Sequence, residues 1–185
     1  MAPVTITQTL YASTREEWRA WLEKNHAQAK EIWLITWSKE SGKPSVPYLH
    51  AVEEALCFGW IDGIAKKMNE HQYAQRFTPR RPKSHWTELN KQRMRRLIAA
   101  GKMTPAGLAI APDLSLEAFR IAPDILAALQ ADPETWRNFT EFPDTYQRIR
   151  VGYIEEVRRQ PEVFQTRLDN FLKNTRKNKM YGVLE

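Results

Sequence analysis

The sequence predicts an α+β fold: a small, mostly antiparallel β-sheet flanked by helices, followed by a C-terminal helical module. Residues 32–37 form a short run that is apolar except for Thr36 and is rich in strand-forming residues. Residues 60–67 and 73–78 form two more strand-like runs around a polar turn. From residue 123 onward the apolar spacing is helical only, which predicts the module.

The first helix is predicted over residues 14–28. Thr14 followed by Glu17 is a capping box, in which the hydroxyl and the carboxylate satisfy amides at the start of the helix. Its buried face consists of residues at helical spacing: Trp18, Trp21 and Leu22. The apolar run at 32–37 then has the pattern of a strand covered on both faces.

Two further helices are predicted in the N-terminal half. Pro47 suits the first turn of a helix that ends before Gly59. Ser84 is a suitable N-cap for a helix that ends at Gly101.

Residues 102–114 form a connection punctuated by proline and glycine, which predicts an α+β domain over 1–108 and a small helical module packed on it over 109–185. The alternative is one continuous unit. Pairs of proline and an acid open the helices of the module, because proline tolerates the first turn and the acid faces the positive end of the helix dipole. These pairs are Pro123-Asp124, Asp132-Pro133, Pro143-Asp144 and Pro161-Glu162. Residues 173–179 are expected to fray into a basic tail.

The composition indicates an ordinary globular protein, with 42% apolar and 27% charged residues. Cys57 is the single cysteine, which excludes an internal disulfide, and its place near a helix C-terminus disfavours a thiolate nucleophile. The scattered histidines predict no metal site, and no glycine-rich phosphate loop or Gly-x-Ser-x-Gly motif is present, so no cofactor is expected. Residues 1–10 lack the features of a secretory signal, and no apolar run reaches the length of a membrane span. We therefore expect a cytoplasmic protein without membrane insertion, or a periplasmic one if a signal peptide has been removed.

Positive charge is the strongest local feature. Residues 76–102 contain nine Lys or Arg and a single acid, Glu88, and aromatic residues are interleaved with them. We expect a basic surface that includes Arg76, Arg81, Lys91 and Arg95. Such a surface suits single-stranded nucleic acid or a small anion. The same pattern is also typical of the solvated face of an amphipathic helix without a binding function.

A ligand pocket is predicted between the sheet and the proline-fixed loop at 79–86. Asp62, within an apolar segment, needs a partner, and Lys66 follows it at short range. Asp62 and Lys66 would line the floor of this pocket, and Arg80, Lys83 and Trp86 would line its rim. Loops of this kind commonly carry function.

Several segments of the chain resemble the YdeI/OmpD-associated (OmdA-like, bacteriocin-protection) family of bacterial proteins. They are EWRAWLEKNH (17–26), IWLITWSK (32–39), AVEEALCFGWIDG (51–63), RFTPRRPKSHW (76–86) and LIAAGKMTPAGL (97–108), and the helical module from Pro123 also resembles the family. The chain departs from the usual family pattern where it reads LSLEAFRIA (114–122).

The resemblance implies resistance to bacteriocins and cationic antimicrobial peptides, and it carries no catalytic residue to this chain. Together with the residues, it favours a non-catalytic binding or stress-protection protein whose partner is a small anionic ligand, a peptide or another protein. Two alternatives stay open. One is a small enzyme for an anionic metabolite, with Asp62 as general base and Arg80 or Lys83 as an electrostatic clamp. The other is a weak nucleic-acid binder that uses residues 76–102 together with the tail at 173–179.

Overall fold

A computed structural model describes residues 4–182. The chain divides into two compact units. Unit 1 comprises the chain up to Ser84 together with Arg96–Ala111, and unit 2 comprises His85–Arg95 together with the chain from Pro112 onward. The helix α3 (Glu88–Ala99) contributes its first residues to unit 2 and its last residues to unit 1.

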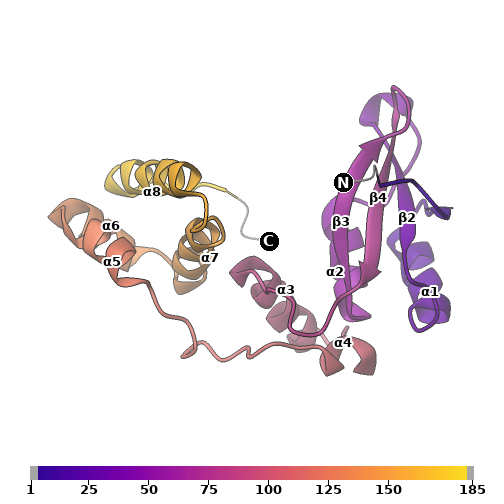
Figure 1. The fold of residues 1–185 in the computed structure, drawn as a ribbon, viewed down its shortest axis with the longest axis horizontal. Helices are drawn as coiled ribbons and strands as arrows, with labels where there is room; N and C mark the ends of the chain where they lie inside the picture. The colour runs from indigo at the N-terminus through magenta and orange to yellow at the C-terminus, as the bar shows by residue number, and fades with distance from the viewer. Residues whose placement is uncertain (1–3, 183–185) are drawn as a thin grey trace. The chain divides into compact units, whose positions relative to one another are not determined.

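Unit 1 is built around a four-stranded sheet (Figure 1). Its elements are β1 (Thr9–Tyr11), α1 (Arg15–Asn25), β2 (Ile32–Trp37), the 3₁₀ turn η1 (Lys39–Ser41), α2 (Tyr48–Cys57), β3 (Trp60–Lys67), β4 (Gln72–Pro79) and α4 (Pro105–Ala109). The strand order is β1-β2-β4-β3, in which β1 pairs with β2 in parallel and the other two pairs are antiparallel. The prediction of an α+β fold with a mostly antiparallel sheet is therefore confirmed.

The helices α1 and α2 cover one face of the sheet. The Trp18 ring of α1 packs on Phe77 of β4 with 5.2 Å between ring centroids, and its indole Nε1 donates to the Ala51 carbonyl of α2 at 3.0 Å. The opposite face carries a second buried cluster that contains Trp33 and Ile35. Residues 32–35 of β2 are buried on both faces, as their unbroken apolar pattern predicts.

The capping box at α1 is confirmed with one difference. The Thr14 hydroxyl accepts a hydrogen bond from the Glu17 N–H at 3.2 Å. The Glu17 carboxylate reaches back to the Ser13 N–H at 2.7 Å rather than to the amide of Thr14 itself.

The predicted start of α3 is wrong. Ser84 belongs to a tight turn that precedes the helix, because its N–H donates to the Arg81 carbonyl at 3.1 Å. The Thr87 hydroxyl accepts from the Asn90 N–H at 3.1 Å, so Thr87 provides the cap and α3 begins at Glu88.

Unit 2 is helical throughout its regular part (Figure 1). Its further helices are α5 (Pro123–Gln130), α6 (Pro133–Glu141), α7 (Asp144–Glu155) and α8 (Pro161–Arg176). Three of these four helices have proline in the first turn, and Pro143 is the N-cap of α7. The core joins them through buried apolar residues: Ile125, Leu129, Phe139, Phe142, Tyr146, Val151, Ile154, Leu168 and Phe171.

The predicted fraying over residues 173–179 is wrong for residues 173–176, because α8 continues to Arg176. The Asn138 amide of α6 donates to the Thr175 carbonyl at 3.0 Å and to the Arg176 carbonyl at 3.1 Å. These bonds satisfy carbonyls that a helix end otherwise leaves to solvent, and they hold the last turn against α6.

Candidate functional site

The loop that follows β4 forms a turn at residues 81–84 that carries Arg81 and Lys83, which we call the basic turn. Pro82 occupies its second position, and Lys83 occupies the third with a positive φ of 59°. The hydrogen bond from the Ser84 N–H to the Arg81 carbonyl closes it. Turns with proline second and a positive φ third normally have glycine at the third position, because a Cβ is strained there. Lys83 is therefore held in an unfavourable conformation, a feature that often accompanies a functional role.

Arg80 anchors the basic turn to the sheet. Its N–H donates to the Gly59 carbonyl at 2.9 Å, and its Nη1 donates to the Ser84 hydroxyl at 3.1 Å. The residue is only 7% exposed. Burial lowers the pKa of the Arg80 guanidinium from its ordinary value, and the charge of Asp62 opposes that shift. A buried cation with a nearby carboxylate fixes the base of the turn.

Asp62 lies on the helix-covered side of β3. It is in register with Phe77, and its carboxylate accepts a hydrogen bond from the Tyr48 hydroxyl at 2.6 Å. Tyr48 begins α2 and is 54% exposed. The structure therefore brings Asp62 close to Arg80, with the exposed Tyr48 ring beside them.

Lys66 lies on the opposite face of the sheet from Asp62. A register shift between Asp62 and Ala65 reverses the alternation of β3, so Lys66 is in register with Ala74, which belongs to the cluster on the face without helices. The Lys66 ammonium donates to the Val4 carbonyl. The structure does not place Lys66 beside Asp62, and strict alternation along a strand could not reveal this.

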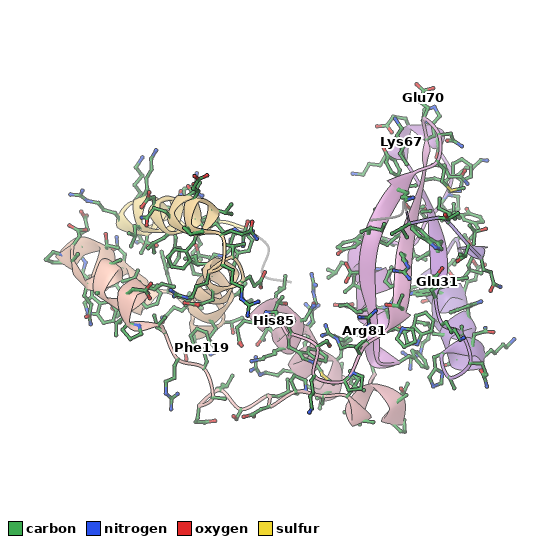
Figure 2. All side chains as sticks on the ribbon, in the orientation of Figure 1. Glu31, Lys67, Glu70, Arg81, His85 and Phe119 are labelled. Carbon is green, nitrogen blue, oxygen red and sulfur yellow. The ribbon has the colours of Figure 1, made fainter. Side chains whose placement is uncertain are left out.

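The remaining predicted pocket residues are divided between the units. Lys83 is exposed on the basic turn of unit 1, whereas Trp86 is half-buried and belongs to unit 2. Figure 2 labels Arg81 on the chain that leaves β4, at the end of the sheet away from Lys67 and Glu70. The side chains of Arg81 and Lys83 form no ion pair within residues 4–182. Their positive charges are thus available to an anion.

The rest of the predicted basic surface is largely engaged. The Arg76 Nε donates to Glu31 at 2.8 Å, and the Lys91 ammonium pairs with Glu88 at 2.7 Å. The Arg95 Nε donates to the Leu114 carbonyl at 2.9 Å. Arg76 lies in unit 1, whereas Lys91 and Arg95 lie in unit 2, so the basic residues of 76–102 do not form one strip within a single unit.

Sequence reasoning missed a buried cluster of charges on unit 1. Glu54 of α2 is 2% exposed, and its two oxygens meet Arg15 Nε at 2.5 Å and Arg19 Nη1 at 2.7 Å. Its neighbour Glu53 pairs with Arg15 Nη1 at 3.0 Å and with Arg96 of α3. Burial by itself favours a lower pKa for Arg15 and Arg19. The hydrogen bonds and the negative charge of Glu54 outweigh burial, so the pKa of both arginines is raised above its ordinary value. Two adjacent acids in an otherwise apolar helix were the available signal, since buried acids need cations.

Cys57 is buried beside this cluster. Burial, followed by the negative charge of Glu54, raises the pKa of its thiol to about 11. The thiol stays protonated near neutral pH, which agrees with an inert cysteine.

No group of three or more His, Cys, Asp or Glu side chains converges as a metal site anywhere in residues 4–182. Over the same residues, none of the helices combines the length and the apolar character that crossing a membrane requires.

The elements of unit 1 make it an α+β unit that carries the basic turn, and unit 2 is helical. The chain belongs to the family defined by a domain of unknown function (DUF8412), whose model matches residues 10–110. The model described as "Bacteriocin-protection, YdeI or OmpD-Associated" (OmdA) matches residues 118–178, so the resemblance found in the sequence is confirmed. That match covers the helical part of the chain, whereas most of the segments that suggested the family lie within the other match. The curated proteins and the solved structures contain no match to the chain.

Proposed function

We propose that this protein is a non-catalytic binding protein that acts in bacteriocin or related stress protection, and that its basic turn binds an anionic group of the ligand. The family match over residues 118–178 supports the physiological role. The conformation of Lys83 is the observation that carries the binding site, because the turn holds a strained lysine where glycine would be relaxed. Such strain persists when surrounding contacts enforce it, and here Pro82 and the Arg80–Ser84 hydrogen bond do so.

The chemistry of the turn favours a phosphate or carboxylate. Arg81 offers a planar fork of donors, and Lys83 offers a compact ammonium on the other side of Pro82. The buried Arg80 positions both, because it ties Ser84 to the end of the sheet. The exposed Tyr48 ring at the same end of the sheet provides an apolar contact for the rest of the ligand.

The binding test uses the full chain and a panel of defined anions. Inorganic phosphate, pyrophosphate, ATP and N-acetylated peptides with a free C-terminal carboxylate are screened by thermal shift. A ligand that binds the folded state alone raises the melting temperature, with about 2.7 kcal/mol of stabilisation at a hundredfold excess over Kd. We expect at least one class of anion to do so, and the shift to disappear in the double variant Arg81→Gln/Lys83→Gln.

The control for this experiment removes the same two charges elsewhere on unit 1. Lys39 and Lys67 are exposed, and Lys67 lies at the end of the sheet away from Arg81 (Figure 2). The double variant Lys39→Gln/Lys67→Gln should keep the full shift. Equal loss of the shift in both double variants would indicate nonspecific attraction to a basic protein and would contradict the proposal.

The strain at Lys83 gives a second prediction. Lys83→Gly should raise the free energy of unfolding by about 0.5–1 kcal/mol, because relief of the left-handed conformation exceeds the added entropy of an unfolded glycine. The same variant should weaken anion binding, since it lacks the ammonium. Lys83→Gln should weaken binding equally but leave stability unchanged. Urea denaturation measures the first effect, and a stability of Lys83→Gly at or below that of wild type would show that the turn holds no strain.

A further inference from the structure

The strand β1 leaves a row of backbone groups open at one edge of the sheet. The Gln8 carbonyl accepts from the Trp33 N–H at 3.0 Å, and Thr9 is in register with Trp33. In a parallel ladder only alternate residues of a strand bond to a given neighbour, so residues 8, 10 and 12 face β2. The N–H and C=O groups of Thr9 and Tyr11 therefore point away from β2, and β1 is the last strand in the sheet order.

The two edges of the sheet differ in how well they resist pairing. The edge strand β3 is interrupted by the register shift after Asp62 and carries Lys66 and Lys67, both of which discourage a further strand. The edge strand β1 has only three residues, Thr9-Leu10-Tyr11, but none of them is charged and its pairing with β2 shows no register shift. The β1 edge is thus the one suited to accept another strand.

A groove runs between the β1 edge and the helix α1. Its volume is about 540 Å³. Its walls include Leu10 and Tyr11 from β1, and Ala20, Trp21 and Lys24 from α1. Leu10 is in register with Leu34, so its side chain lies on the helix-covered side of the sheet. A strand added to β1 would place alternate side chains in this groove.

We propose that the groove between β1 and α1 binds an extended peptide segment of a partner protein by adding it as a fifth strand. Every second side chain of this peptide faces the groove, and the side chains that do so include one apolar and one acidic residue. The open groups of Thr9 and Tyr11 provide backbone hydrogen bonds for such a strand. Leu10, Ala20 and Trp21 form an apolar surface for one side chain. This site is separate from the basic turn and does not depend on the function proposed for it.

The charges beside the groove select an acidic side chain. The Glu17 carboxylate accepts from both the backbone N–H and the hydroxyl of Ser13, and these bonds lower its pKa. Glu17 is therefore committed to capping α1. Lys24 is exposed and forms no ion pair within the described part of the chain, so its ammonium is available to a carboxylate of the peptide.

The test begins with a random heptapeptide library displayed on phage and selected against the full chain. Enriched peptides are synthesised with blocked ends and a fluorescent label, and their Kd is measured by fluorescence polarisation. Thr9→Pro removes one outward N–H without affecting the β2 ladder, and Ala20→Arg fills the groove. Each should weaken binding by about tenfold or more. Thr9→Val keeps the N–H and Ala27→Arg adds the same charge outside the groove, so both should bind as wild type does.

A scan of N-methylated peptides tests the same backbone hydrogen bonds on the wild-type protein, so it does not depend on whether a variant folds. N-methylation at every second peptide residue should abolish binding to the wild-type protein, whereas methylation at the intervening residues should not. Absence of any saturable binder, binding unaffected by Thr9→Pro and Ala20→Arg, or a methylation pattern without this alternation would overturn the proposal. A dimer of the chain that forms through β1 and excludes peptides would also overturn it, because a second copy would then be the occupant.

Discussion

Replacement of Glu54 by alanine is expected to destabilise unit 1 by about 3 kcal/mol, because removing one partner of a buried ion pair leaves uncompensated charge. Glu54 is 2% exposed and bonds to both Arg15 and Arg19. The two arginines keep partial access to solvent, which places the effect at the lower end of the range for buried pairs. Urea unfolding followed by tryptophan fluorescence measures it, since five of the seven tryptophans (18, 21, 33, 37 and 60) lie in unit 1.

The matched control for Glu54 is Glu23. It forms an ion pair with the same Arg19, at 3.4 Å, but its side chain is 57% exposed. Glu23→Ala should therefore cost less than about 0.5 kcal/mol. Equal free energies of unfolding for the two alanine variants would show that the ion pairs of Glu54 do not stabilise unit 1.

Phe171→Ala is expected to destabilise unit 2 by about 3–5 kcal/mol, the range for removing a fully buried phenylalanine. Phe171 of α8 has no exposed surface, and its ring contacts Phe139 and Tyr146 with 6.1 Å and 6.4 Å between ring centroids. Its loss leaves a cavity where α6, α7 and α8 meet. Hydrogen exchange of the α8 amides reports on this unit alone, and exchange through unfolding should be at least about 100-fold faster than in wild type.

Val163 of the same helix provides the comparison for Phe171. It is 40% exposed and lies outside the buried cluster, so Val163→Ala should change exchange in α8 by less than about threefold. Similar exchange rates in the two variants would show that the aromatic cluster does not stabilise unit 2.

Local patterns predicted the elements of the fold well. The largely apolar run at 32–37 coincides with β2, and proline marked the starts of α5, α6 and α8. These features depend on neighbouring residues, which a sequence shows directly. The errors arose where a side-chain contact decides the end of a helix. Arg80 engages Ser84 in the turn before α3, and Asn138 of α6 holds the end of α8.

The candidate site was predictable only in part, for the same reason. The composition of the 79–86 loop identified Arg80 and Lys83, and the apolar setting of Asp62 indicated that it needs a partner. The register shift in β3, which separates Lys66 from Asp62, has no clear mark in the sequence. The pairing of Glu53 and Glu54 with three arginines from α1 and α3 depends on how helices pack, which periodicity alone does not specify.

Binding of an anionic group by the basic turn at residues 81–84 is tested most directly by nuclear magnetic resonance. The full chain labelled with ¹⁵N is titrated with pyrophosphate, and the backbone amides and the arginine Nε–H groups are followed. We predict saturable shifts concentrated at Arg81, Lys83 and Ser84, which vanish in Arg81→Gln/Lys83→Gln and persist in Lys39→Gln/Lys67→Gln. Shifts that do not saturate, or that spread over exposed lysines throughout the chain without preference for the turn, would show that the basic turn is not an anion-binding site.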